Sequence, residues 1–445
     1  MTNRATTHPS NAFSRHVGLG ILLTGLLICL FAALGYGPHA PMFSLVVGIG
    51  GATFGAIWYI LATYLHTWPG IKNNYVMQNT FTARGVGGWF LGFLLTGFYV
   101  LLYWFPEYLK NVVAITEPLS QWMRGAAADQ WFLYGLFYTL CVLVMGIRMF
   151  YKYRHNRYQI FRTLSVMLFQ TLFAFIIPAV LKLMNKPEFY FHYFWPLDYD
   201  YLFPSTVQWL SSGASVAFFA LIVGIVMSFI ITPLLTYFFG KRWYCSWVCG
   251  CGGLAETLGD PFRQLSDKSL RAWKIERWMI HTVLVFIVVL TALLWLNSWQ
   301  QGAFLGAFSQ TYAKWYGFWI GSVFSGVIGV GFYPIMGSRV WCRFGCPMAA
   351  LMGLQQKWFS RFRITTNGGQ CISCGNCSAY CEMGIDVRWY AQRGQNIVRA
   401  SCVGCGVCAA VCPRGVLKLE NGAPDRNERY GKAVMIHADE VNISP

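Results

Sequence analysis

Long apolar runs separated by short polar loops fill most of this chain. Eight of these runs are long enough to cross a bilayer as helices, which takes about 20 residues each. Their approximate limits are 17–37, 42–65, 85–105, 130–150, 163–184, 214–239, 279–298 and 316–336. The first run exceeds the apolar core of a secretory signal, which has about 7–15 residues, so we expect it to be retained. The pattern predicts an all-α polytopic membrane protein with about eight transmembrane helices.

Composition agrees with a membrane protein. Hydrophobic residues make up 56% of the chain and charged residues only 11%, whereas a soluble domain carries about 25% charged residues. The net charge of +17 could indicate a nucleic-acid partner. However, the lysines and arginines lie in loops between apolar runs rather than on one soluble face, which is typical of the flanks of membrane spans. We therefore expect the lipid bilayer, and no nucleic acid, as a partner.

The basic residues also predict the orientation of the spans, because lysine and arginine are enriched in cytoplasmic loops. With the N-terminus inside, only five of the 34 lysines and arginines fall in outer loops: Lys110, Arg124, Lys182, Lys186 and Lys314. Thiolates that bind iron must stay reduced, as they do in the cytosol. We expect a multi-pass protein of the bacterial cytoplasmic (inner) membrane, with its N-terminus and its cysteine-rich C-terminal domain in the cytoplasm.

Two cysteine runs near the C-terminus share the C-x₂-C-x₂-C-x₃-C spacing of bacterial ferredoxins. Because the fourth cysteine of each run ligates the other cluster in such proteins, the spacing predicts two crossed [4Fe–4S] sites. One is expected to use Cys371, Cys374, Cys377 and Cys412, and the other Cys402, Cys405, Cys408 and Cys381.

These patterns divide the chain into three predicted parts. Residues 1–162 are expected to form an N-terminal membrane region of four spans, and residues 163–360 a second membrane region of four spans. Residues 361–445 are expected to form a small α+β ferredoxin-like domain with two clusters, followed by a tail. The combination of a membrane bundle and a two-cluster domain indicates electron transfer at a membrane.

A second cysteine pattern recurs at the ends of the sixth and eighth runs. Residues 240–249, GKRWYCSWVC, align with residues 337–346, GSRVWCRFGC. On a helix, the C-x₃-C spacing places both thiols of each pair on one face. Two interpretations stay open: the thiols could hold a third metal centre, iron–sulfur or copper, or they could pack as small apolar residues. The four cysteines are Cys245, Cys249, Cys342 and Cys346, and Cys251 could replace Cys249.

Arg242 and Arg339 occupy equivalent positions in the two frames. They either anchor the span ends at the cytoplasmic surface or contribute to cofactor binding by stabilising a reduced, more negative centre.

The predicted outer loop, residues 186–203, is crowded with aromatic side chains: Phe189, Tyr190, Phe191, Tyr193, Phe194, Trp195, Tyr199, Tyr201 and Phe203. They could form an interfacial belt, a quinone pocket or a docking surface for an outer partner. The sequence shows no clear second set of redox ligands across the roughly 30 Å apolar core. Electrons would therefore need a quinone, a further cofactor, or a partner subunit carrying haem, flavin or an iron–sulfur cluster.

The combined motifs resemble the NapH/NosR type of membrane iron–sulfur proteins, a group that includes the oxidase-assembly protein CcoG. The resemblance covers roughly residues 214–419; the CxxxCP pair of that group is kept at Cys346-Pro347, whereas Gly250 follows Cys249. It implies [4Fe–4S] clusters and electron transfer between a quinone pool or cytosolic donor and a redox partner, as a quinol dehydrogenase or oxidoreductase subunit. The alternative that it implies is a metal-handling assembly factor for a copper or haem oxidase, similar to a CcoG-like copper reductase.

Overall fold

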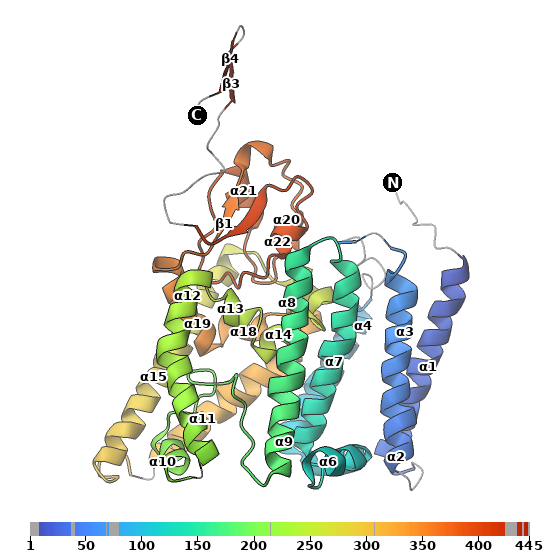
Figure 1. The fold of residues 1–445 in the computed structure, drawn as a ribbon, viewed down its shortest axis with the longest axis vertical. Coiled ribbons are helices and arrows are strands. Elements are labelled where there is room, and N and C mark those ends of the chain that lie inside the picture. Colours follow the sequence, from blue (N-terminus) through green and yellow to red (C-terminus); the bar gives the residue numbers. More distant parts are fainter. Residues whose placement is uncertain are drawn as a thin grey trace.

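The computed structural model describes residues 9–36, 41–67, 69–70, 80–213, 215–306, 308–422, 434–437 and 440–443. Arg4, in the polar start of the chain, and most of the tail after Gly422 lie outside the described residues. The described chain is mostly helical, and a bundle of long helices carries a small cysteine-rich region at one end (Figure 1).

Seven segments of the described chain are helices long and apolar enough to cross a membrane. They are Ala12–Ala33, Pro41–Tyr64, Val86–Trp104, Gln130–Lys152, Arg157–Leu183, Ser215–Phe239 and Leu270–Trp299. Seven of the eight predicted runs are therefore confirmed as candidate spans. The fifth and seventh begin earlier than predicted, at Arg157 and Leu270, because each helix continues through polar residues beyond its apolar stretch.

The eighth predicted run, 316–336, is not among these seven helices. α16 (Phe308–Tyr316) and the π-helical η7 (Gly317–Ile328) are followed by turns at residues 329–332 and then by α17 (Tyr333–Met336). The chain packs closely where the helix is interrupted, since a Cβ atom on Gly331 would lie 2.2 Å from the carbonyl oxygen of Val327. Pro334 lacks a backbone N–H and is suited to the first turn of α17.

Three of the spanning segments begin with side-chain caps, and three combine α-helical and π-helical turns. Asp129, Asn156 and Ser269 each accept a hydrogen bond from a backbone N–H at a helix start. The elements are α1 (Pro9–Ala33), α2 (Pro41–Phe43), η1 (Ser44–Gly50), α3 (Gly51–Tyr64), α4 (Val86–Trp104), α7 (Gln130–Lys152), α8 (Arg157–Leu168), η4 (Phe169–Ile176), α9 (Ile177–Leu183), α11 (Ser215–Val226), η5 (Met227–Ile231), α12 (Thr232–Phe239) and α15 (Leu270–Trp299).

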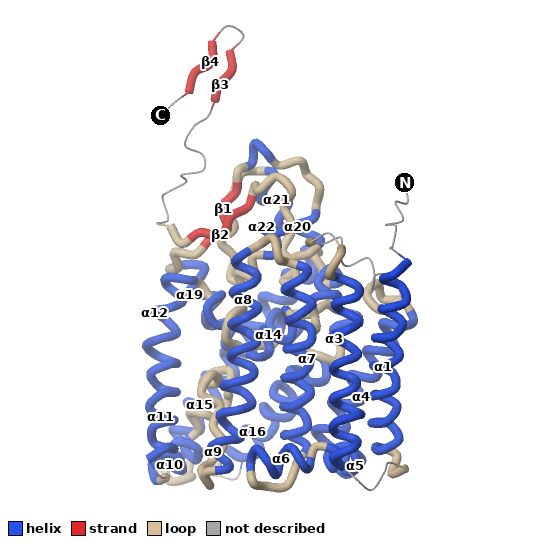
Figure 2. Tube along the Cα trace, turned by 45° about the vertical axis from the view of Figure 1, so that its right-hand side comes forward, coloured by secondary structure: helices blue, strands red, loops and turns tan. Residues whose placement is uncertain are grey.

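Short helices lie at both ends of the bundle. At the end away from the cysteine-rich region are η3 (Pro106–Leu109), α5 (Lys110–Ile115), α6 (Glu117–Arg124) and α10 (Pro204–Ser212) (Figures 1 and 2). Toward the cysteine-rich region are α13 (Arg242–Cys245), α14 (Gly250–Glu256), η6 (Asp260–Leu265), α18 (Val340–Phe344) and α19 (Pro347–Trp358). This second group contains the paired cysteines.

The cysteine-rich region is small and contains little regular structure. Strands β1 (Arg363–Thr366) and β2 (Leu417–Glu420) pair antiparallel, with Arg363 opposite Glu420 (Figure 2). Between them lie η8 (Gly368–Gln370), α20 (Asn376–Ala379), α21 (Val387–Gln392) and α22 (Val407–Ala410). A separate hairpin, β3 (Val434–His437) and β4 (Glu440–Ile443), follows in the tail.

One buried core runs from the bundle into the cysteine-rich region. It joins Ile287 of α15 and Trp341 of α18 to Phe362, Ile364 and Val403, all of which are buried. The cysteine-rich region therefore packs onto the bundle rather than standing apart from it.

The aromatic segment 186–203, between α9 and α10, reaches the short helices that carry the paired cysteines. The Tyr244 hydroxyl donates a hydrogen bond of 2.7 Å to the backbone oxygen of His192. Gly250 lies so close that a Cβ atom there would be 2.4 Å from the Tyr193 hydroxyl oxygen. The segment thus enters the bundle, whereas an interfacial belt alone would keep it at the membrane surface.

Candidate metal centres

The first cysteine site lies at the outer part of the cysteine-rich region. A cavity there is lined by four cysteines, Cys371, Cys374, Cys377 and Cys412. Three come from the first cysteine run and one from the second, which is the first of the two groups that the spacing predicts. We call this group site I. Its Cys374 is exposed to solvent.

The second cysteine site lies closer to the bundle. Its cavity is lined by Cys381, Cys402, Cys405 and Cys408, which is the other predicted group. We call it site II. Cys402 and Cys408 are 7% and 6% exposed, so site II is better shielded from water than site I. Shielding of this kind is one of the determinants of the potential of an iron–sulfur cluster.

The backbone around the two sites is shaped by equivalent glycines. Gly375 and Gly406 have φ angles of 80° and 74° and precede the single-turn helices α20 and α22. This left-handed conformation costs glycine little, and it turns the chain sharply between the second and third cysteine of each run. The backbone N–H of Ile385 also donates to the Cys381 sulfur at 3.4 Å, and such hydrogen bonds tune cluster potential.

The four remaining paired cysteines also come together, and we call them the CxxxC quartet (Cys245, Cys249, Cys342 and Cys346). All four are buried, at 5–7% exposure, within the same core. The expectation of one continuous helix per pair is wrong. Cys245 ends α13 and Cys249 caps α14, while Cys342 lies in α18 and Cys346 caps α19. Each pair therefore brackets a helix break. The Cys346 sulfur accepts a hydrogen bond from the Ala349 N–H at the start of α19, whereas Cys249 holds the equivalent position at the start of α14 without such a bond.

The surroundings of the quartet are mostly apolar but include a guanidinium. Burial raises the pKa of the Cys245 thiol to about 12. Burial also raises the pKa of Cys342, against the opposing effect of Arg339. Arg339 donates to the Cys342 sulfur at 3.5 Å and to the Cys245 backbone oxygen at 3.2 Å. Arg339 is thus the positive charge positioned to stabilise thiolates at this quartet.

The two equivalent arginines have different environments. Arg339 is 1% exposed and contacts the quartet directly. Arg242 instead lies against the cysteine-rich region, where its guanidinium is 4.7 Å from the Phe362 ring centre and donates to the Asn421 side chain at 2.9 Å. Although the two arginines occupy equivalent positions in the sequence repeat, they contact different parts of the protein.

The spacing of the thiols bears on the kind of metal group that fits. Among the residues that the structure describes, one trio of His, Cys, Asp or Glu ligand atoms lies within 4.8 Å of one another: Glu256, Glu382 and Cys405. A single ion held by thiolates at about 2.3 Å would bring the sulfurs to about 3.8 Å from each other. No three thiols of the quartet or of sites I and II, all of which are described, lie within 4.8 Å of one another, so a single tetrahedral ion would require the sulfurs to move together, whereas a multi-iron cluster would not.

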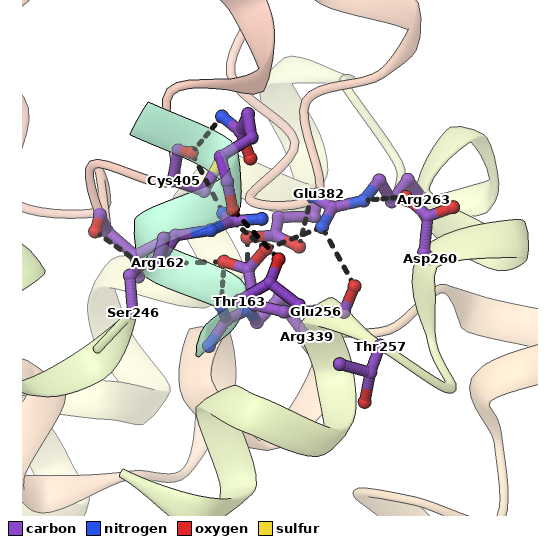
Figure 3. A network of polar contacts seen from close by, with 12 residues as sticks. Arg162, Thr163, Ser246, Glu256, Thr257, Asp260, Arg263, Arg339, Glu382 and Cys405 are labelled. Atoms are coloured by element: carbon purple, nitrogen blue, oxygen red, sulfur yellow. Dashed lines mark hydrogen bonds and ion pairs between the residues drawn. The ribbon is translucent and has the colours of Figure 1, made fainter. Parts of the chain in front are cut away.

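A buried ion network (Figure 3) contacts the quartet through Arg339 and site II through Arg162. Glu256 pairs with Arg162, Arg263 and Arg339 at 2.5, 2.6 and 2.6 Å. Glu382 pairs with Arg263 at 2.7 Å and with Arg339 at 3.1 Å. Burial alone would raise the pKa of Glu256, but the three guanidiniums lower it to about 2. Glu256 therefore carries its negative charge inside the protein.

Asp260 extends this network to the bundle. It pairs with Arg148 and Lys152 of α7 at 2.6 Å each and with Arg263 at 2.7 Å. All of these side chains are almost fully buried.

Across the network, four arginines and Lys152 surround three carboxylates. Arg339 brings positive charge to the quartet, whereas the carboxylates of Glu256 and Glu382 lie within 4.8 Å of the Cys405 sulfur in site II. Positive charge favours the reduced, more negative state of a nearby redox centre.

A hydrogen bond joins the residue after Cys245 of the quartet to the residue after Cys402 of site II. The Ser246 hydroxyl, next to Cys245, donates to the backbone oxygen of Val403, next to Cys402, at 2.8 Å. On the other side of site II, Arg162 and Gln159 donate to the backbone oxygen of Cys405 at 2.8 Å each. The loops that carry the site II cysteines are therefore held by the membrane region.

Replacing Ser246 with alanine is expected to lower the free energy of unfolding by about 1–3 kcal/mol, because the buried Val403 carbonyl loses its donor. Thermal unfolding of the purified protein in detergent checks this. Ser211→Ala is the matched control, since the Ser211 hydroxyl bonds only within its own exposed helix turn. Equal unfolding temperatures for the two variants would contradict a structural role for the Ser246 hydrogen bond.

A cavity of about 450 Å³ adjoins the quartet on its membrane side. Cys251, Trp341 and Pro347 line it near the quartet, and Asp198 and Tyr199 of the aromatic segment line it as well. The remaining lining residues are Tyr103, Trp131, Tyr190, Tyr193, Leu197, Tyr316, Ile320, Gly321 and Ser325. Its walls are thus largely aromatic, with one carboxyl group and several hydroxyl groups.

Several residues of these sites were not predicted from the sequence. Glu256, Asp260 and Glu382 form no motif, although the chain has only 17 acidic residues and buried charges near a membrane are rarely without a role. His192 is 3% exposed, and neither of its ring nitrogens has a hydrogen-bond partner among the described residues. The scarcity of acidic residues was the available signal for the first three.

Comparison with protein families agrees with the cysteine patterns. A family described as a 4Fe-4S dicluster domain matches residues 370–417, which contain all eight cysteines of sites I and II. A family described as a 4Fe-4S binding domain matches residues 216–269 and 318–365, the two segments that contain the CxxxC quartet. The chain is thus a helical protein with candidate membrane spans that carries ferredoxin-type 4Fe-4S domains, as the spacing predicts.

Among curated proteins, the chain is similar to one from Escherichia coli (strain K12) named "Putative electron transport protein YccM". The identity is 28% over 164 residues, which is 35% of this chain and 44% of that protein. The chain therefore matches less than half of the length of this relative. No solved structure matches the chain.

Proposed function

We propose that this protein transfers electrons between a membrane quinone and a redox partner on its cysteine-rich side. The observation that carries this proposal is the order of the sites. The aromatic cavity adjoins the quartet, Ser246 connects the quartet to site II, and site II shares its cysteine runs with the exposed site I. The name of the Escherichia coli relative also supports electron transport.

The proposed ligands of the first cluster are the four cysteines of site I, and those of the second are the four cysteines of site II. [4Fe–4S] clusters at these sites would supply one-electron transfer. The exposed Cys374 makes site I the point of contact for a partner that carries haem, flavin or an iron–sulfur cluster. The chain's own contribution is to hold the sulfurs apart, donate backbone N–H groups to them and exclude water from site II.

The CxxxC quartet is proposed to hold a third centre. Its match to a 4Fe-4S binding family and the wide spread of its sulfurs favour iron–sulfur over a lone copper ion. Arg339 is the proposed cofactor-stabilising arginine, because it donates to Cys342, while the contacts of Arg242 support a role in docking the cysteine-rich region. The metal-handling alternative would need the quartet thiols to come together around a single ion, and no three of these described thiols lie within 4.8 Å of one another.

The aromatic cavity is the proposed quinone site. A quinone head group is flat and apolar with two oxygens that accept hydrogen bonds, and the cavity offers aromatic walls with tyrosine and serine hydroxyl groups. Asp198 is the carboxylate in its lining and is the proposed group that takes up a proton released by a quinol. The aromatic segment 186–203 would thus supply part of a quinone site.

In the proposed topology the chain crosses the bacterial inner membrane eight times. The N-terminus and the cysteine-rich region both lie on the cytoplasmic side. α1 begins at the bundle end that carries the cysteine-rich region (Figure 1), which requires an even number of crossings. Seven are the long apolar helices, and α16 with η7 is the proposed eighth. The domains at residues 1–162, 163–360 and 361–445 remain part of the proposal, with the first boundary inside α8 (Arg157–Leu168).

Filling the cavity tests the proposal. Gly321 lines it, and a Cβ atom there would lie 3.3 Å from the Tyr199 ring, so Gly321→Leu places a side chain where the quinone would bind. We expect cluster reduction by a quinol analogue to slow at least about tenfold, which is about 1.4 kcal/mol of lost stabilisation, while reduction by dithionite is unchanged. Bleaching of the visible iron–sulfur absorption measures both rates.

The matched control is Gly97→Leu, because a Cβ atom at Gly97 meets nothing within 4 Å and the residue lies in another span. Equal rates for the two variants would exclude this cavity as the quinone site. If dithionite reduces the wild-type clusters but quinol analogues do not, the quinone proposal is overturned. Copper bound in place of iron, and lost in Cys245→Ser, would favour the metal-handling function.

A further inference from the structure

A second large cavity, lined in part by Cys342 of the quartet, lies between α15, α19 and the cysteine-rich region. Its volume is about 870 Å³, which is within the usual range of ligand pockets. Six cationic side chains line it: Lys241, Lys274, Arg277, Arg343, Lys357 and Arg399. Glu276 is the acidic residue in the lining. We call this cavity the basic cleft.

Glu276 does not neutralise the basic cleft. Its carboxylate pairs with Arg343 at 2.7 Å and also accepts a hydrogen bond from Ser401. Five cations therefore remain without a carboxylate partner among the ion pairs of the described residues. A concave surface of one charge sign with low-dielectric walls concentrates the electrostatic potential, so the basic cleft attracts an anion.

Two buried cations point to a ligand more directly. Arg343 is 3% exposed, and its Nη2 atom is buried without a hydrogen-bond partner in the part of the chain that the structure describes. Lys241 is 1% exposed and also lines the cleft. Leaving a buried guanidinium nitrogen unsatisfied costs free energy, and an anion oxygen in the cleft would remove that cost.

Two of the four remaining cations, Arg277 and Arg399, are held near each other. The guanidiniums of Arg277 and Arg399 lie 5.2 and 4.8 Å from the ring centre of the same side chain, Trp273. Two positively charged side chains, one from α15 and one from the cysteine-rich region, thus lie against the same Trp273 ring. Guanidinium groups match phosphate oxygens in geometry and charge, and the arrangement is suited to a phosphate group better than to a small monovalent ion.

One wall of the cleft is apolar. Ala349, Ala350 and Leu354 of α19 line it together with Ile280, and Cys342 of the quartet reaches the same wall. The cleft opens beside aromatic side chains that face outward, since Trp278 is 79% exposed and Trp358 is 62% exposed. Such tryptophans are typical of the membrane–water interface, so the cleft is accessible from the headgroup layer and from the aqueous side.

We infer that the basic cleft binds a phosphate-bearing anion whose uncharged part lies against α19, next to the quartet. Two sources share this chemistry: an anionic phospholipid of the adjoining leaflet and a soluble nucleotide. The site is independent of the quinone cavity, and its existence does not require the proposed direction or partner of electron transfer.

The test uses the full chain, purified with its clusters and placed in nanodiscs of neutral phosphatidylcholine. Phosphatidylglycerol is then mixed into the nanodiscs, or flavin mononucleotide, NADH or inorganic phosphate is added to the solution, and thermal unfolding is recorded. A rise in unfolding temperature with phosphatidylglycerol identifies a lipid, whereas a rise with a soluble phosphate compound identifies a nucleotide-type ligand. No rise with either overturns the inference.

The double variant Lys274→Gln/Arg277→Gln removes two exposed cations from the rim. We expect it to weaken binding about 10- to 30-fold, since each cation near a phosphate layer contributes roughly a factor of five. The matched control is Arg388→Gln/Arg393→Gln, which removes two exposed cations from the cysteine-rich region outside the cleft. An equal loss of binding in both double variants would mean that general positive charge, and not the basic cleft, attracts the anion.

Discussion

Replacing Cys408 with serine is expected to lower the iron content by about four per chain, the content of one [4Fe–4S] cluster, and to stop electron passage from quinol to a soluble acceptor. Cys408 is buried in site II, and site II lies between the quartet and the exposed site I. Serine offers an oxygen in place of the thiolate that iron–sulfur clusters require. Iron and acid-labile sulfide in anaerobically purified protein, with electron paramagnetic resonance after dithionite, give the measurement.

Cys29→Ser is the matched control, since Cys29 lies within the first span and outside the cysteine sites. It should keep the full iron content. The same assay tests the third centre: about twelve irons per chain, falling by about four in Cys245→Ser, would mean that the quartet holds a cluster. Full iron retention in Cys408→Ser would contradict the assignment of site II.

Replacing Glu256 with glutamine is expected to lower the free energy of unfolding by about 3–5 kcal/mol, because breaking a buried ion pair leaves uncompensated charge. Glu256 pairs with three guanidiniums at 2.5–2.6 Å, in a network that already has more cations than carboxylates. Its removal therefore leaves Arg162, Arg263 and Arg339 to repel one another. Thermal unfolding in detergent, followed together with loss of iron, measures the effect.

Glu107→Gln is the control for this change, since Glu107 is exposed in η3 at the other end of the bundle. Exposed substitutions usually alter stability by less than about 0.5 kcal/mol. The network would not be a stabilising element if Glu256→Gln unfolded at the wild-type temperature. A variant that keeps its iron but unfolds earlier would separate the structural contribution of the network from cluster binding.

The parts of this protein that could be predicted are those encoded by periodic or repeated patterns. Apolar runs predict spans because a helix of about 20 apolar residues matches the thickness of the hydrocarbon core of a bilayer. The cysteine spacing predicts which thiols meet, since one run alone cannot surround a cluster, and the cavities group Cys412 with the first run and Cys381 with the second. The repeat at 240–249 and 337–346 likewise predicts a quartet, although not the helix breaks within it.

The parts that could not be predicted depend on long-range contacts of single residues. Arg242 and Arg339 are equivalent in sequence, yet only Arg339 meets Glu256 and Cys342. Hydropathy assigns residues 186–203 to an outer loop because it reports how polar the residues are and not how far they reach into the bundle. The contact between this segment and Tyr244 therefore could not be predicted from the hydropathy pattern. The eighth run is absent from the seven long apolar helices for a related reason: its composition is apolar, but the chain turns at residues 329–332.

The backbone support of site II bears on how the protein is assembled in the cell. Tyr158, Gln159 and Arg162 of α8 donate hydrogen bonds to the backbone oxygens of Gly404 and Cys405. The ribosome synthesises α8 well before these cysteines, so the supporting helix is already inserted when the ligand loop emerges. The ligand loop of site II therefore reaches its final conformation only where α8 is already folded, which ties completion of this site to the bundle rather than to the cysteine-rich region alone.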